Sequence, residues 1–247
     1  MELNAFKNLI ISEFSEKVNF DLSEYQCECL FDYMNLLIEK NKVMNLTAIT
    51  DPKEIILRHF VDSSILLKIY GKNFFNDKKI VDVGTGAGFP GLPLAILCSK
   101  GNFVLTDTLG KRINFLQEVI GQLKILNVKL IKARTEDFAH DNYFRESFDY
   151  CLSRGVAKIS VLSEYSLPLL KIGGKMLAYK LNDCDEELNE GMVAINTLGG
   201  KFHVKHSYDL ILGEPKRCIL EIDKTLTTLK RYPRKAGIPS KEPLWCP

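Results

Sequence analysis

The 247-residue chain has no apolar stretch of about twenty residues, the length that a membrane-spanning helix requires. Its first seventeen residues include Glu2, Lys7, Glu13 and Glu16, where a secretory signal would be apolar. With 46% hydrophobic side chains the chain can bury one large core. These features predict a globular, cytoplasmic protein with no membrane partner.

Paired cysteines are also absent. The seven cysteines are an odd number, without a C-x-x-C pair or a histidine at zinc spacing. They are Cys27, Cys29, Cys98, Cys151, Cys184, Cys218 and Cys246. This pattern excludes a disulfide framework and predicts free thiols, mostly in the core, and no metal site.

Glycine is concentrated where the expected strand 79–83 ends. The glycines that alternate in this loop are Gly84, Gly86 and Gly88. Glycine there allows positive φ and a close approach of main-chain N–H groups to a ligand, although an ordinary turn is the alternative. A dinucleotide fingerprint needs a third glycine where Phe89 stands. Asp82 would repel a pyrophosphate but favour an ammonium group, so S-adenosylmethionine is predicted rather than a nicotinamide cofactor.

A second carboxylate follows the next expected strand, 103–106. Asp107 lies nineteen residues after Gly88, a spacing at which an acid accepts hydrogen bonds from ribose hydroxyls. Asp107 is therefore the predicted ribose ligand. Its alternative role is the N-cap of the helix expected over 109–126.

The hydrophobic spacing divides the chain into three zones. The first is helical, over 3–14, 23–40 and 52–70, with Asp51 and Glu54 forming a capping-box pattern. The second alternates strands at 79–83, 103–106, 128–131, 148–152 and 175–179 with helices starting near 90, 110, 136 and 158. The third runs through a helix near 184–197 into strands 202–208 and 217–222, which look like a hairpin. The alternation predicts a parallel sheet with right-handed crossovers.

The net charge of +2 is unevenly distributed. The first thirty residues are acidic, whereas 224–241 contains Lys224, Lys230, Arg231, Arg234, Lys235 and Lys241 and no acid. Such a basic arm suits a phosphate backbone, since binding releases counterions. A solvated tail is the alternative. The expected organisation is a helical cap (1–70), a main domain (71–223) and the basic arm (224–247).

Six segments together resemble the RsmG family, also called glucose-inhibited division protein B. They are Met44–Ile49, Leu57–Ser63, Val81–Gly91, Asp107–Arg112, Ser153–Ala157 and Tyr232–Gly237. The resemblance covers roughly residues 25 to 240. It implies a bacterial enzyme that methylates N7 of one guanine in 16S ribosomal RNA. It also implies the class I S-adenosylmethionine-dependent methyltransferase fold: Rossmann-like α/β, with a mostly parallel seven-stranded sheet, helices on both faces, a C-terminal antiparallel hairpin and an N-terminal helical cap.

The resemblance also implies roles for individual residues. Gly84 and Phe89 would contact the cofactor, Asp107, Thr108 and Leu109 its ribose and adenine, and Thr135 and Glu136 its adenine. Arg154 would close the site beside the methyl group, and its alternative is a salt bridge. Arg134, Lys180 and Arg217 would line the substrate face.

Further RNA contacts are expected from Arg58 and His59 on the third helix and from the arm residues Arg231, Arg234 and Lys235. A structural i, i+4 pair with Asp62 is the alternative for Arg58. A satisfied buried histidine is the alternative for His59.

The end of the expected fourth strand narrows the chemistry. It reads Ser153-Arg154-Gly155-Val156, without the Asn/Asp-Pro-Pro-Tyr/Phe turn of amino-group methylation. Cys151 lacks the activating base that methylation of a pyrimidine carbon would need. Guanine N7 has a free lone pair and no proton, so direct displacement needs positioning rather than a base.

Three alternatives stay open: methylation of another RNA or of a small molecule, a nucleic-acid-binding protein that has lost catalysis, and, less favoured, a dehydrogenase. The leading prediction is a monomeric methyltransferase acting on 16S ribosomal RNA or the 30S subunit particle. It needs S-adenosylmethionine and no metal.

Overall fold

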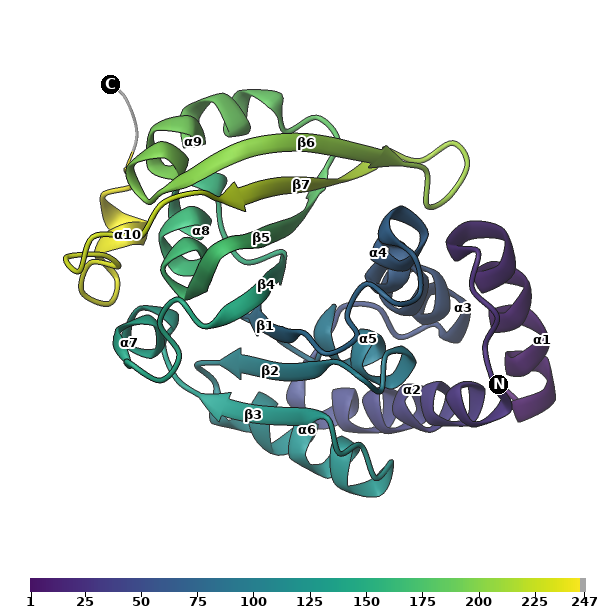
Figure 1. Cartoon of the computed structure of the whole chain (residues 1–247). Coiled ribbons are helices and arrows are strands. Elements are labelled where there is room, and N and C mark those ends of the chain that lie inside the picture. Colours follow the sequence, from purple (N-terminus) through teal and green to yellow (C-terminus); the bar gives the residue numbers. More distant parts are fainter. Residues whose placement is uncertain (245–247) are drawn as a thin grey trace.

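The computed structural model, which describes residues 1–244, is built around a seven-stranded sheet in the order β3-β2-β1-β4-β5-β7-β6. Figure 1 shows the strands in this order from bottom to top. The strands are β1 (Lys79–Val83), β2 (Asn102–Asp107), β3 (Val128–Lys132), β4 (Phe148–Arg154), β5 (Leu170–Leu181), β6 (Gly200–Tyr208) and β7 (Arg217–Lys224). The first five are parallel, and β7 is antiparallel to both β5 and β6. The predicted mostly parallel sheet and C-terminal hairpin are confirmed.

Most helices occupy positions that the sequence predicts, but the short helices at 167–169 and 238–241 were not expected. The N-terminal set is α1 (Leu3–Glu13), η1 (Phe14–Val18), α2 (Glu24–Met44), α3 (Pro52–Ile55), η2 (Ile56–Val61) and α4 (Asp62–Tyr70). The remaining helices are α5 (Gly91–Leu97), α6 (Gly110–Gln122), α7 (Thr135–His140), α8 (Ile159–Ser166), η3 (Leu167–Leu169), α9 (Asp185–Thr197) and α10 (Ile238–Lys241). The expected single helix 52–70 is helical throughout, but its middle, η2, is a π-helical turn. Such wide turns occur often at functional sites.

The helix caps agree only in part with the sequence pattern. Asp51 caps α3, because its carboxylate accepts hydrogen bonds from the N–H groups of Lys53 and Glu54. The expected capping box is wrong there, since the Glu54 carboxylate binds Arg58. A complete capping box instead begins α2, where Ser23 and Gln26 exchange hydrogen bonds.

Each face of the sheet is covered by its own hydrophobic core. The N-terminal helices, α5 and α6 lie on one face, and α7, α8 and α9 lie on the other (Figure 1). Successive strand residues alternate between the two cores, as Ile80 and Val81 do on β1. The predicted helical cap therefore shares a core with the sheet. Within residues 1–244 no helix is both long and apolar enough to span a bilayer.

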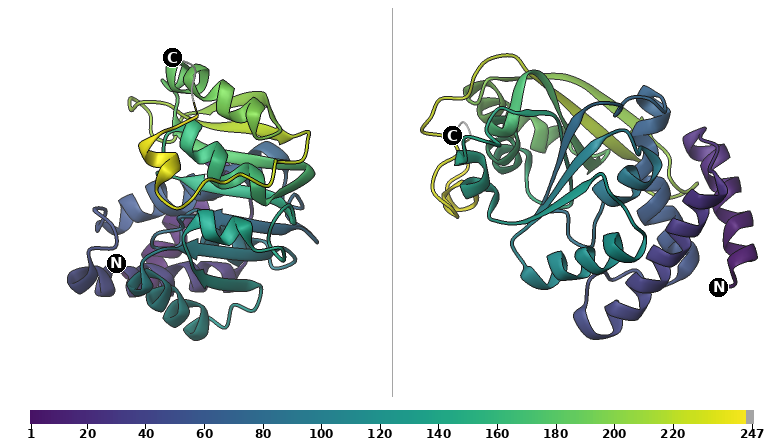
Figure 2. Two further views of the ribbon diagram at one scale, coloured as in Figure 1. Left: turned by 90° about the vertical axis from the view of Figure 1, so that its left-hand side faces the viewer. Right: turned by 60° about the horizontal axis from the view of Figure 1, so that its bottom comes forward.

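The C-terminal segment, residues 225–244, packs on the face of the sheet that α7, α8 and α9 cover (Figure 2). Arg145 donates to the main-chain oxygens of Thr228 and Tyr232, each at 2.8 Å. Lys224, expected to begin a basic arm, ends β7 instead, and its fully buried ammonium donates to Leu167 O at 2.7 Å. Burial lowers the pKa of Lys224 to about 8. Lys224 therefore belongs to the core, and its inclusion in the arm is wrong.

The cysteine prediction is confirmed for the six cysteines that the structure describes, which are free and buried. Cys246 lies outside the described residues, as do Trp245 and Pro247 at the end of the predicted arm.

Candidate cofactor and substrate site

The glycine loop joins β1 to α5 at the carboxyl edge of the sheet. Gly84, Gly86 and Gly88 have φ angles of +67°, +63° and +110°, a region that residues with a Cβ rarely adopt. The loop is tied to the neighbouring strand, because Thr85 N–H donates to Thr106 O at 2.9 Å. Ligands of open α/β sheets bind at this edge.

The side chain of Asp82, near the end of β1, fixes the glycine loop by hydrogen bonds. The side chain is 1% exposed, and its Oδ2 accepts from Thr85 Oγ1 at 2.6 Å and from Gly91 N–H at 2.9 Å. Its Oδ1 is buried without a hydrogen-bond partner among residues 1–244. Burial raises the pKa of Asp82 to about 7. The local role of Asp82 is to fix the loop, and its attraction for a cofactor ammonium stays a prediction.

Asp107 ends β2; it is not the N-cap of α6, which is Leu109, and its role as ribose ligand stays a prediction. Its Oδ1 accepts from Leu109 N–H at 2.9 Å, which fixes the entry into α6. Its Oδ2 accepts from Gly86 N–H at 3.0 Å and from Arg112 Nη1 at 3.1 Å. Asp107 therefore joins the glycine loop to the second strand. Thr108 and Leu109 are exposed beside it.

The predicted adenine residues lie where β3 leads into α7. Thr135 is half-buried, and Glu136 is 5% exposed. The Glu136 carboxylate accepts from Gly237 N–H at 2.8 Å, so it binds the C-terminal segment. The sequence predicted that Glu136 lies beside the cofactor crevice. It did not predict the contact with Gly237.

Phe89 connects the loop to the N-terminal helices. Its ring stacks on His59 at a centroid distance of 4.3 Å and on Tyr33 at 5.5 Å. The Arg154 guanidinium lies over the same ring at 5.1 Å, within cation–π range. The residue that replaces the third glycine of a dinucleotide fingerprint thus has a packing role.

Arg154, at the end of β4, forms the salt bridge named as its alternative. Its Nη1 donates to Asp62 Oδ2 at 2.8 Å and to Arg58 O at 3.0 Å. Arg217 Nη1 donates to the same Asp62 oxygen at 2.8 Å, and Tyr208 Oη donates to Oδ1 at 2.8 Å. Asp62 is 1% exposed, so a buried carboxylate holds both arginines.

His59 extends this network in its neutral form. Its Nδ1 lies 3.2 Å from Arg154 Nη2, and because a guanidinium only donates, Nδ1 is the acceptor. Nε2–H then donates to Thr47 Oγ1 at 3.0 Å. Burial, helped by the charge of Arg154, lowers the pKa of His59 to about 3. His59 is therefore a satisfied buried histidine that stays uncharged near neutral pH.

Arg58 does not pair with Asp62, so that alternative is wrong. Its guanidinium binds Glu54 and Glu214 Oε1, the latter at 2.5 Å. Asp62 is turned instead toward Arg154 and Arg217.

A cavity of about 720 Å³ opens next to the loop. Its walls include Arg154, Val156, Lys180, Glu187, Tyr208 and Arg217. A Cβ added at Gly84 would come within 2.9 Å of the Val156 side chain, so the loop and the cavity share a wall. The structure thus brings Arg154, Lys180 and Arg217 together, as the expected substrate face requires.

The other predicted RNA contacts lie outside this cavity. Arg134 is exposed at the start of α7, and Arg231 and Lys235 are exposed on the C-terminal segment. Arg234 is not free, because it forms several hydrogen bonds to the buried carboxylate of Glu164.

Sequence reasoning missed Tyr208, Glu187 and Arg112. The hairpin could have indicated Tyr208, because it pairs with Arg217 where β6 and β7 meet their turn. Glu187 stands in the acidic first turn of α9, a position typical of helix starts. Arg112 belongs to the segment Asp107–Arg112 that carries the resemblance, but its contact with Asp107 depends on the turn into α6.

Among residues 1–244, His203, Glu221 and Asp223 are grouped closely enough to hold a metal ion. The Lys175 ammonium already contacts Glu221 at 2.5 Å and Asp223 at 2.7 Å. This group lies along β5, β6 and β7, apart from the glycine loop.

Comparison with known sequences identifies the family. A family model described as GidB, rRNA small subunit methyltransferase G, matches residues 26–209. The chain is 44% identical over 236 residues to the Ribosomal RNA small subunit methyltransferase G of Desulforamulus reducens, covering 96% of this chain and 98% of the relative. It is 43% identical over 228 residues to the protein of that name from Clostridium tetani, covering 92% and 93%.

Solved structures show the same fold at low sequence identity. A SAM-dependent methyltransferase from Aquifex aeolicus superposes with a TM-score of 0.52 at 19% identity, covering 75% of this chain and 98% of that one. TrmN from Thermus thermophilus gives 0.50 at 15% identity, covering 68% and 53%. With the family match over most of its length, the chain belongs to the GidB family of rRNA small subunit methyltransferase G proteins.

Proposed function

We propose that this chain transfers a methyl group from S-adenosylmethionine to N7 of one guanine in 16S ribosomal RNA. The family supports the reaction class, since the relatives are named as ribosomal RNA small subunit methyltransferases. The observation that carries the proposal is the shared wall between the glycine loop and the cavity, made where Gly84 meets Val156. A cofactor on the loop and a base in the cavity would be neighbours.

The residues of the loop fit S-adenosylmethionine. A Cβ added at Gly86 would meet nothing within 4 Å, so the main chain is open to a ligand there. Asp107 uses three hydrogen bonds of the roughly four that a carboxylate accepts, and one comes from Arg112, whose side chain is 34% exposed. When Arg112 swings away, Asp107 can accept from ribose hydroxyls. Thr108, Leu109 and Thr135 would flank the adenosine.

When bound, S-adenosylmethionine supplies a methyl group on a sulfonium centre. The protein's own task is to align the guanine, because N7 carries a lone pair and has no proton to lose. Neutral His59 is consistent with this chemistry, since a base is not required. We assign alignment to Arg154, whose guanidinium is fixed by Asp62 and can donate to guanine O6.

Affinity for RNA would come from cations outside the cavity. Arg134, Arg231 and Lys235 are exposed, whereas Arg58 and Arg234 are held by acids and contribute less to phosphate binding. Lys180 and Arg217 are held by Glu187 and Asp62 in the cavity wall and would contact the nucleotide there. We propose that the chain works as a cytoplasmic monomer on the 30S particle, and RNA binding should weaken as salt rises.

The proposal is tested by transfer of tritiated methyl from S-adenosylmethionine to 16S RNA and to 30S particles lacking the modification, followed by nucleoside analysis. We expect label in 7-methylguanosine at one site. At a cofactor concentration below saturation, Asp107→Ala should slow transfer about 10- to 100-fold. Lys100→Ala, an exposed change before the amino end of β2, should not. Label in a different nucleoside would overturn the N7 assignment. Transfer only to another RNA or a small molecule would overturn the ribosomal substrate.

A further inference from the structure

Glu187, near the start of α9, lines the cavity and has one of its two carboxylate oxygens anchored by the protein. Its Oε1 accepts from Lys180 Nζ at 2.5 Å and from Ile159 N–H at 2.7 Å. Lys180 also donates to Ala157 O at 2.8 Å, which ties β5 and α9 to the turn that follows Arg154. The other carboxylate oxygen of Glu187, Oε2, has no hydrogen-bond partner within residues 1–244. The side chain is 24% exposed and lines the cavity, and its Oε1 is anchored, which leaves Oε2 as the acceptor available to a ligand.

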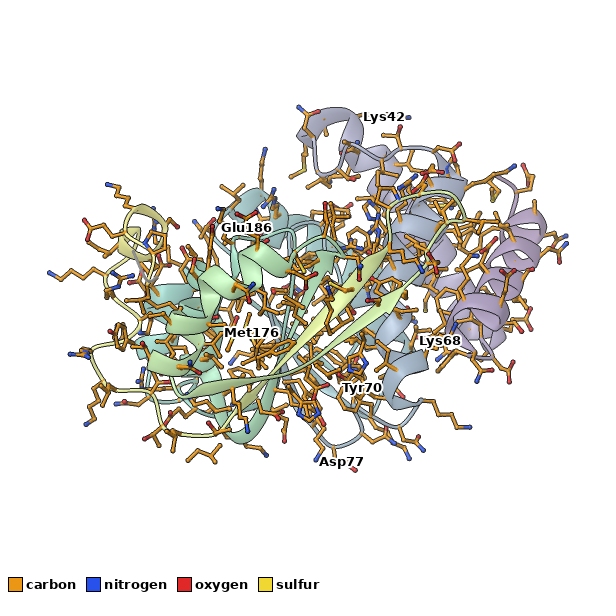
Figure 3. The ribbon with its side chains drawn as sticks, turned by 90° about the horizontal axis from the view of Figure 1, so that it is seen from above. Lys42, Lys68, Tyr70, Asp77, Met176 and Glu186 are labelled. Atoms are coloured by element: carbon orange, nitrogen blue, oxygen red, sulfur yellow. The ribbon has the colours of Figure 1, made fainter. Side chains whose placement is uncertain are left out.

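Arg154 and Glu187 lie on opposite walls of the cavity, which belong to opposite faces of the sheet. Neighbouring residues of a strand point to opposite faces of the sheet. On β5, Tyr179 points toward the N-terminal helices, because its hydroxyl binds Ser63 O, while Lys180 points toward α8 and α9. Arg154 binds Asp62 on the first side. In Figure 3, Glu186 marks α9 on one side of the sheet, and Lys68 and Tyr70 mark α4 on the other.

A cavity with guanidinium donors on one wall and a carboxylate acceptor on the other matches the two ends of guanine. Guanine carries acceptors, N7 and O6, along one edge and a donor, its 2-amino group, at the far end of the ring. Adenine lacks that amino group and has a donor in place of O6. A base held with O6 toward Arg154 would direct its 2-amino group away from that wall.

We propose that Glu187 is the residue that selects guanine, with its Oε2 accepting a hydrogen bond from the 2-amino group and Lys180 positioning the carboxylate. This inference rests on the proposed function and assigns a specificity residue to it. The energetic reason is that a carboxylate left unpaired in a filled cavity disfavours a base without the amino group.

The test replaces the target guanosine of the RNA by inosine, which differs only in lacking the 2-amino group. We expect wild type to methylate the guanosine RNA with a kcat/KM about 10- to 100-fold above that of the inosine RNA, the range for a charge-assisted hydrogen bond. In Glu187→Gln the amide oxygen can still accept from Lys180 and Ile159. The amide NH2 replaces Oε2, so the preference should collapse to within about 3-fold.

Two controls separate this role from a structural one. Asp185→Asn removes the same charge from the same helical turn, where Asp185 pairs with Lys205 at 2.5 Å, and should keep the full preference. Cofactor affinity and the unfolding midpoint of Glu187→Gln should match wild type, because its anchoring bonds persist.

The outcomes distinguish the two proposals. Equal methylation of guanosine and inosine RNA by wild type would overturn the role of Glu187 and leave the proposed function standing. An undiminished preference in Glu187→Gln would do the same. Absence of transfer to any ribosomal RNA by wild type would overturn the proposed function and, with it, this inference.

Discussion

The glycine loop and the Asp62 network meet at Phe89 but are assembled differently. The loop takes its geometry mainly from one stretch, 82–91, with anchors from Tyr33 and from the end of β2 at Thr106 and Asp107. The network joins Asp62 on α4, Arg154 on β4, Tyr208 on β6 and Arg217 on β7. The difference teaches that damage to the loop should remain local, whereas damage to the network should loosen the cap from the sheet. Four substitutions test this contrast.

Asp62→Asn should have the largest effect. Arg154 and Arg217, whose side chains are 16% and 24% exposed, would keep their charges without a counterion. Breaking a buried pair costs about 3–5 kcal/mol. We expect the free energy of unfolding, measured in urea, to fall by about 3–5 kcal/mol. Methyl transfer should fall more than 100-fold. An unchanged unfolding midpoint would show that the network does not hold the cap to the sheet.

Asp107→Ala should separate binding from stability. The variant loses an acceptor for the cofactor ribose, and charged hydrogen bonds contribute about 1.5–3 kcal/mol each. We expect cofactor affinity, measured by calorimetry, to fall about 10- to 100-fold. Unfolding should change less than in Asp62→Asn, since Arg112 can turn to solvent. A loss of stability as large as that of Asp62→Asn would contradict the contrast between the two regions.

Asp82 makes stability depend on pH in a way that Asp82→Asn removes. Its folded pKa of about 7 lies above the ordinary value of 3.8, so between these values the folded state binds more protons than the unfolded state. Stability from this group is therefore present below pH 4 and declines as pH rises to 7, by up to about 1.4 kcal/mol per pH unit. The asparagine oxygen can still accept from Thr85 and Gly91. Unfolding of both proteins from pH 4 to 8 should show a shallower decline in the variant, and parallel curves would refute the assignment.

Arg112→Ala should have the smallest effect and the opposite sign. It removes the exposed guanidinium that contacts Asp107 Oδ2 at 3.1 Å. Partly exposed pairs contribute about 0.2–1 kcal/mol. We expect cofactor affinity to rise by about 2- to 5-fold with stability almost unchanged. Weaker binding would mean that Arg112 contacts the cofactor itself instead of competing with it.

Much of the fold was predictable because its signals are local. The strands were recognised because burial on both faces gives them continuous apolar runs. The strand 79–83 has the predicted bounds, and the ranges predicted for the other six strands are shorter than the observed ones. Asp51 was recognised as a cap from its place before Pro52. The fate of the basic segment was not predictable, because Lys224 and Arg234 are engaged by groups distant in sequence, Leu167 and Glu164.

The sequence by itself determined the glycine loop, the acids that flank it and the order of strands and helices. These follow from backbone freedom, charge and hydrophobic period within short segments. Only the tertiary structure decided that Asp62 holds Arg154 rather than Arg58, that His59 is neutral and that Glu187 faces the cavity. The physical reason is that the partner of a buried charge is set by which chain segments burial brings together, and sequence spacing does not record this.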